Sequence, residues 1–132
     1  MICKYEYRDN ILFQTLPEVL TISDALLLVK EMDIIDGGYS VMPNRLVNFQ
    51  GTKSFQGDFT TVLGVAEQRE RKKFPNHFKS ALLVANTFQL GFARMLQTLD
   101  DNPQIMMKIF TDESKAIEWL KTDDTHVSNS SS

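Results

Sequence analysis

The chain has 132 residues, of which 42% are hydrophobic and one is cysteine. This length and composition predict a single domain with one core, and a lone thiol excludes an internal disulfide. The 14 Lys and Arg against 17 Asp and Glu give a net charge of −3, which argues against a dedicated nucleic-acid binder because an acidic surface repels phosphate.

Cellular location is the next property that the sequence bears on. The first eight residues alternate polar and apolar side chains and contain no apolar stretch of signal-peptide length. The longest apolar runs, residues 25–29 and 81–85, are far shorter than a bilayer-spanning helix. We therefore expect a cytoplasmic protein with no membrane partner.

A β-hairpin is predicted at the start of the chain. Apolar or aromatic side chains alternate with charged ones in residues 3–8, which is the pattern of a half-buried strand. Asp9-Asn10 is a turn signal, residues 11–16 resume a strand, and Pro17 ends it because proline cannot donate to a ladder.

The first predicted helix follows. Thr21 is its N-cap, and Asp24 three residues later completes a capping box. Residues 37–38, both glycine, close the helix. Its apolar stripe at helical spacing consists of Ile22, Ala25, Leu26 and Val29.

The middle of the chain is predicted to be a short strand, a loop and a second helix. Residues 45–49 are the strand, and residues 50–57 are a polar loop that contains glycine. Asp58 is expected to cap the helix, which Pro75 stops. The stripe of this helix consists of Phe59, Val62, Leu63 and Ala66.

The next strand and helix have the clearest patterns. Residues 80–85 are almost entirely apolar, as in a strand that is covered on both faces. Asn86 or Thr87 is expected to cap the third helix, which Asp100 and the residues after it break. Its predicted apolar side consists of Phe88, Phe92, Met95, Leu96 and Leu99.

One more strand and helix end the ordered part of the chain. Residues 105–110 form the strand, and Thr111 is expected to cap a helix that faces inward through Ala116, Ile117 and Leu120. Residues 123–132 are polar and are predicted to be a flexible tail.

The order of elements predicts the fold class. Alternating strands and helices favour parallel pairing with helices covering the sheet, and the leading hairpin adds one antiparallel edge strand. We expect a single α/β domain over residues 1–122, with a five-stranded mixed sheet and four helices.

The sequence does not indicate a catalytic or metal centre. His77 and His126 are far apart, and no paired Cys or His motif suggests zinc. Nucleophile and phosphate-loop motifs are absent as well, so we expect no cofactor and no enzymatic activity. The basic cluster is interpreted as a solvated helix face, and it consists of Arg69, Arg71, Lys72, Lys73 and Lys79.

The last third of the chain resembles a known group of proteins. Residues 81–86 (ALLVAN), 88–95 (FQLGFARM) and 109–120 (IFTDESKAIEWL) are similar to the corresponding strands and helix starts of STAS-like domains, especially the small stand-alone SpoIIAA-like proteins of bacteria. The resemblance implies a SpoIIAA-like architecture and a regulatory role through protein binding. In the anti-sigma-factor antagonists of this group a phosphorylatable serine precedes the second helix, whereas here Asp58 stands at the helix start.

Two functional hypotheses remain open. The first is a non-enzymatic regulatory module that presents residues 50–58 and the following helix to a protein partner. The alternative is a carrier of a small apolar or anionic ligand, bound between the 50–58 loop and the helix start at 86–88. A sizeable apolar cavity would favour the carrier, and a space filled by side chains would favour the module.

Both hypotheses share one candidate surface. Its residues are Asn48, Ser54, Asp58, Thr60, Thr61, Asn86 and Thr87. A homodimer is also expected, because Cys3, Tyr5 and Tyr7 alternate on a predicted edge strand whose outer backbone groups are free to pair.

Overall fold

A computed structural model describes residues 1–58, 60–61, 63–65, 67 and 72–122. This part of the chain forms a five-stranded mixed sheet in the order β1-β2-β4-β6-β7. The first pair, β1 and β2, is antiparallel and the other pairs are parallel, as the sequence predicted. The strands are β1 (Lys4–Arg8), β2 (Ile11–Thr15), β4 (Asn44–Asn48), β6 (Phe78–Leu83) and β7 (Ile105–Phe110).

The hairpin between β1 and β2 is built on its two turn residues. Asp9 and Asn10 both have positive φ angles, 55° and 64°. Two such residues in a two-residue connection are typical of a type I′ turn, whose twist matches that of the flanking strands. The turn pairs Arg8 with Ile11 and brings Tyr5 opposite Gln14.

A second, two-stranded sheet was not predicted. Its strands, β3 (Val19–Thr21) and β5 (Ser54–Gln56), pair in parallel. The expectation that residues 50–57 are entirely loop was therefore wrong. Strands of three residues are too short to give a recognisable alternation. The two segments are also distant from each other in sequence, although the carbonyl of Glu18 accepts from the N–H groups of Lys53 and Ser54.

Four helices accompany the sheets within the described residues. They are α1 (Ile22–Asp36), a helix that includes residues 60–61, 63–65 and 67, α3 (Thr87–Leu99) and α4 (Glu113–Leu120). The capping box of Thr21 and Asp24 is confirmed, and of the two candidates for α3 the cap is Asn86. The prediction that Thr111 caps the last helix was wrong. The cap is Asp112, whose carboxylate accepts from Lys115 N–H at 3.2 Å and suits the positive end of the helix dipole.

Two of the predicted helix stripes differ from the buried faces. In α1 the side chains of Ile22 and Leu26 are about half exposed, while Leu28 is buried. In α3 Phe88 is 47% exposed, and Gln89 is buried in its place. The predicted apolar face of α3 differs from its buried face because the polar residue Gln89 occupies a core-facing position.

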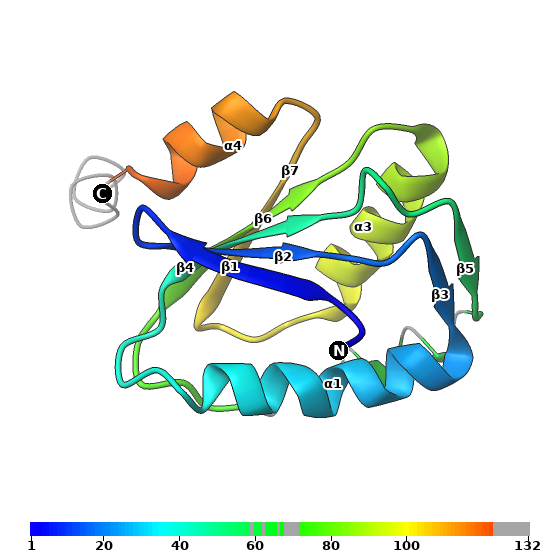
Figure 1. Ribbon diagram of the computed structural model, residues 1–132, viewed down its shortest axis with the longest axis horizontal. Helices are drawn as coiled ribbons and strands as arrows, with labels where there is room; N and C mark the ends of the chain where they lie inside the picture. The colour runs from blue at the N-terminus through cyan, green and yellow to red at the C-terminus, as the bar shows by residue number, and fades with distance from the viewer. Residues whose placement is uncertain (59, 62, 66, 68–71, 123–132) are drawn as a thin grey trace.

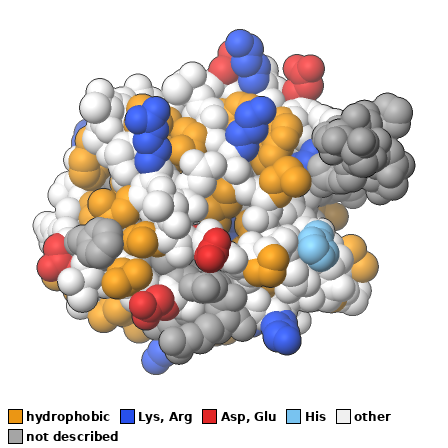
Figure 2. Space-filling model, turned by 180° about the vertical axis from the view of Figure 1, so that it is seen from behind, with side chains coloured by type: hydrophobic (Ala, Val, Ile, Leu, Met, Phe, Trp, Pro, Cys, Tyr) orange, Lys and Arg blue, Asp and Glu red, His pale blue; other side chains and the backbone are white. Residues whose placement is uncertain are grey.

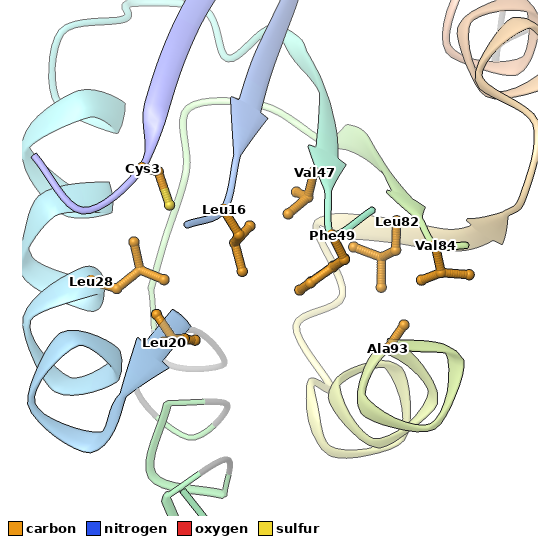
Figure 3. Packing of buried hydrophobic residues seen from close by; sticks show 9 residues of the cluster. All are labelled: Cys3, Leu16, Leu20, Leu28, Val47, Phe49, Leu82, Val84 and Ala93. Atoms are coloured by element: carbon orange, nitrogen blue, oxygen red, sulfur yellow. The ribbon is translucent and has the colours of Figure 1, made fainter. Parts of the chain in front are cut away.

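The sheet separates two cores. On one face α4 packs through Ala116 and Leu120, and on the other face lie α1 and α3 (Figure 1). Figure 3 shows side chains of the sheet pointing into the space that α1 and α3 flank, with Val47 and Leu82 near its centre.

Residues 123–132, the predicted tail, lie outside the described residues. Among the helices that the structure describes, none is long and apolar enough to cross a membrane.

Candidate functional site

The predicted surface residues divide into two groups. Asn86 and Thr87 are exposed at the start of α3. Asp58 and Thr60 are exposed and Thr61 is half-buried at the start of the helix that includes residues 60–61, 63–65 and 67. The second group, Asn48 at the end of β4 and Ser54 at the start of β5, is half-buried.

Asp58 has the geometry of a helix cap. Its carboxylate accepts from the N–H of Thr61 at 3.1 Å and from the Thr61 hydroxyl at 3.2 Å. These bonds stabilise the ionised carboxylate, with the backbone bond as the larger cause, and they lower the pKa of Asp58. The cap positions a negative charge at the predicted surface.

Gln89 joins the loop after β4 to the start of α3. Its Oε1 accepts from Ala85 N–H at 2.7 Å, and its Nε2 donates to the carbonyls of Gln50 at 3.1 Å and Thr52 at 2.9 Å. These bonds close the gap between the loop and the helix, and the Gln89 side chain is accordingly only 1% exposed. The space left beside them, next to Phe88, has a volume of about 10 Å³. The ligand mouth expected at this place is therefore filled.

A larger cavity lies deeper, between the sheet and the helices. Its volume is about 110 Å³, and its lining is almost entirely apolar. The apolar residues that line it come from both sheets and from α1 and α3, and they include Leu16, Leu28, Val47, Phe49, Leu82 and Phe92.

Aromatic rings form one wall of this cavity. The ring of Phe92 lies edge-on to Phe49 at a centroid distance of 5.6 Å and tilted against Phe55 at 4.7 Å. Aromatic pairs at these separations hold each other in place. The three rings therefore form one continuous apolar wall of the cavity.

Three polar side chains lie on the sheet side of the cavity. Gln14, Arg45 and Ser80 line it and come from the adjacent strands β2, β4 and β6. Arg45 is opposite Ser80 in the ladder, and Gln14 is diagonal to Arg45, since Leu12 is the partner of Arg45. All three are buried.

Arg45 carries the positive charge of this polar row. Its guanidinium forms an ion pair with the carboxylate of Asp36 at the end of α1, and both side chains are 2% exposed. The guanidinium also lies 5.8 Å from the ring centroid of Phe78. A buried charge needs such a partner, because an unpaired one costs several kcal/mol (~3–5).

Gln14 belongs to a hydrogen-bond network with the edge strand. Its Nε2 donates to Tyr5 Oη at 3.5 Å and to Cys3 Sγ at 3.6 Å. The Tyr5 hydroxyl in turn donates to Glu31 Oε2 at 3.0 Å, and the backbone N–H groups of Ile2 and Cys3 donate to the same carboxylate.

Burial keeps the Cys3 thiol and the Tyr5 hydroxyl protonated by raising the pKa of each group. Burial raises the pKa of the Cys3 thiol to about 11. Burial, together with the neighbouring Cys3 and Glu31, raises the pKa of Tyr5 far above its usual value. Cys3 is thus a buried thiol with little thiolate at neutral pH, which is the opposite of a reactive cysteine.

The predicted basic cluster is dispersed where the structure describes it. Lys79 is buried, and its Nζ donates to the carbonyls of Trp119 and Thr122, so the interpretation as a solvated residue was wrong for Lys79. Lys72 pairs with Asp33 at 3.3 Å, and Arg69 and Arg71 lie outside the described residues. Among the side chains coloured on the face shown in Figure 2, Lys and Arg are scattered between hydrophobic and neutral ones.

No group of three or more His, Cys, Asp or Glu that could hold a metal ion occurs among the described residues.

Comparison with solved structures gives the fold its name. The chain is similar to the crystal structure of an uncharacterized DUF3478-family protein with a SpoIIAA-like fold from Shewanella loihica PV-4. The TM-score is 0.60, the identity is 16%, and the similarity covers 89% of this chain and 91% of the other. The fold is SpoIIAA-like. This confirms the architecture that the sequence resemblance implied. No family model matches the chain, and no curated protein matches it.

Proposed function

We propose that this SpoIIAA-like chain is a non-enzymatic domain that binds a small apolar molecule in the cavity between the sheet and helices α1 and α3. The observation that carries the proposal is the apolar cavity of about 110 Å³. An apolar cavity of about 150 Å³ lined by Leu, Ile and Phe is known to bind benzene, so the volume suits a molecule with one ring.

The position of the cavity favours a binding site over a packing defect. Protein interiors are close-packed and contain few voids larger than a water molecule. This cavity lies between a rigid sheet and two capped helices, and it combines apolar walls with a few buried polar groups. Sites for small ligands usually have that composition.

The test fills the cavity from the sheet. Val47 points into the space between the helices (Figure 3) and lines the cavity, so Val47→Phe occupies part of the volume. The matched control is Val41→Phe, because Val41 is 69% exposed. Toluene is the probe, and the melting temperature of each variant is measured with and without it.

We expect toluene to raise the melting temperature of the wild type and of Val41→Phe, since a ligand that binds only the native state stabilises it. Val47→Phe should lose this response. An equal response in both variants, or no response in the wild type, would contradict the proposal.

A second candidate function, regulation through a protein partner, is favoured by the exposed ring of Phe88. This ring is 47% exposed beside the predicted surface residues Asn86 and Thr87. Aromatic side chains are enriched at protein interfaces, where they act as anchors. In this hypothesis the partner contacts the loop over residues 50–58 and the start of α3.

Partner binding is tested by adding charge to that surface. Ser54→Glu and Thr61→Glu are compared with Ser114→Glu, a control on α4, which lies on the other face of the sheet. The surface is supported if a partner captured by the wild type and the control is lost with the two surface variants. Recovery of the same partner with all three variants would exclude the surface.

A further inference from the structure

The side chain of Gln14 brings an unsatisfied acceptor to the lining of the cavity. The Oε1 of Gln14 is buried and has no hydrogen-bond partner among the described residues. Gln14 is 1% exposed and lines the cavity. An unsatisfied buried acceptor is costly, so such atoms are rare in native proteins unless water or a ligand completes them.

The neighbours of Gln14 decide which end of its amide is left over. The hydroxyl of Tyr5 has one proton, and it donates that proton to Glu31 at 3.0 Å. Tyr5 Oη can therefore only accept from Gln14, which requires the Nε2 end of the amide to face β1. The raised pKa of Tyr5 keeps its proton in place at neutral pH. The Oε1 end then faces away from β1, on the side of β4 and the cavity.

The charges of the described lining residues argue against an anionic ligand. Arg45 is the cation among them, and its charge is already matched by the carboxylate of Asp36. An anion in this apolar space would lose its hydration without gaining a free cation, and that loss is expensive. This reasoning disfavours an anionic ligand in this cavity.

We propose that the ligand is a neutral, single-ring molecule that carries one hydroxyl group, and that this hydroxyl donates to Oε1 of Gln14 while the ring packs against Phe49, Phe55 and Phe92. The proposal rests on the function proposed above and adds a polarity requirement to it. The cavity volume of about 110 Å³ limits the ligand to one ring, and the unsatisfied Oε1 of Gln14 requires a ligand that donates a hydrogen bond.

The experiment compares phenol with toluene, since the two differ by a hydroxyl in place of a methyl group. Dissociation constants for both are measured by calorimetry with the full chain, in the wild type, in Gln14→Met and in Gln97→Met. Methionine has nearly the length of glutamine but no acceptor of comparable strength. Gln97→Met is the matched control, because it makes the same substitution at an exposed position of α3 and leaves Gln14 and Tyr5 in place.

In Gln14→Met, we expect the ratio of the phenol dissociation constant to the toluene dissociation constant to rise about tenfold over the wild type. This ratio should stay within about twofold of the wild type in Gln97→Met. Toluene binding by Gln14→Met reports that the cavity is intact. If that variant does not fold, the wild type is measured with anisole, which keeps the oxygen but lacks the proton, and phenol should bind more tightly.

The possible failures are distinguishable. Suppose that toluene binds, that Gln14→Met binds phenol as tightly as the wild type does, and that anisole binds as tightly as phenol. The donor requirement is then wrong and the apolar carrier stands. If neither phenol nor toluene binds the wild type, the carrier function is wrong and this proposal falls with it. If benzoate binds as well as phenol, the neutral character of the ligand is overturned.

Discussion

Gln89 offers a direct test of how the loop after β4 is held. We predict that Gln89→Met destabilises the protein while Gln97→Met does not. Both residues lie on α3, but Gln89 is 1% exposed and makes three hydrogen bonds to backbone groups. Gln97 is exposed and donates one bond, to the carbonyl of Met107 at 3.1 Å.

The magnitude follows from the burial of the partners. The bond to Thr52 is buried, and leaving that carbonyl unsatisfied costs about 1–3 kcal/mol. The bonds to Ala85 and Gln50 are half-buried, where water replaces part of the loss, at about 0.5–1.5 kcal/mol each. The expected loss of unfolding free energy is about 2–6 kcal/mol, a large part of the ~5–15 kcal/mol of a typical domain.

The assay is urea denaturation followed by circular dichroism at 25 °C. The midpoint should fall for Gln89→Met and stay close to the wild type for Gln97→Met, with an unchanged slope for both. Methionine fills nearly the same space as glutamine, so a cavity does not explain the difference. A difference of less than about 1 kcal/mol between the two variants would refute the view that Gln89 holds the loop.

Three further predictions concern the core, the cap and the sheet edge. Phe92→Ala should lower the free energy of unfolding by about 3 kcal/mol in chemical denaturation, because Phe92 contacts Phe49 and Phe55. This value is the low end of the range for buried rings, since Phe92 is only half-buried. An unchanged midpoint would contradict its role in the core. The pKa of Asp58 is lowered in the folded state, so its contribution is present above its usual value of 3.8 and is lost as the pH falls through the folded value. The melting temperature of Asp58→Ala should therefore lie below that of the wild type at pH 7, and the difference should shrink as the pH falls below 3.8; a difference that does not change with pH would contradict the prediction. If β1 pairs with a second copy through its outer edge, light scattering at high concentration should give about twice the monomer mass of 15.1 kDa, and the monomer mass would exclude the dimer.

Local signals were sufficient for most of the fold. Asp9-Asn10 specifies a turn through its own backbone preferences, and Thr21 with Asp24 specifies a helix start within four residues. Such features depend on neighbours in the chain, so they are readable without the structure. The pairing of β3 with β5 joins segments more than 30 residues apart, and no local pattern announces it.

The candidate site was less predictable for a related reason. The sequence pointed to polar loops at the carboxyl ends of the strands, but the gap between them is closed by Gln89. The cavity depends on the distances between α1, α3 and the sheet, which periodicity does not determine. One signal was present nonetheless, since Gln14 occupies a core-facing position between Leu12 and Leu16 in an alternating strand.

The polar row beneath the cavity is costly for a domain of this size. Gln14, Arg45 and Ser80 occupy positions where apolar residues would satisfy the strand and fill the core. Replacing a buried ion pair such as Arg45 with Asp36 by apolar residues is often neutral or stabilising in other proteins. Sequences that specify a fold usually depart from local rules where function requires it. Three such departures on adjacent strands, all facing one apolar cavity, are what a binding site needs and what a purely structural core does not. This clustering supports the proposal that the chain binds a ligand inside the domain, under α1 and α3.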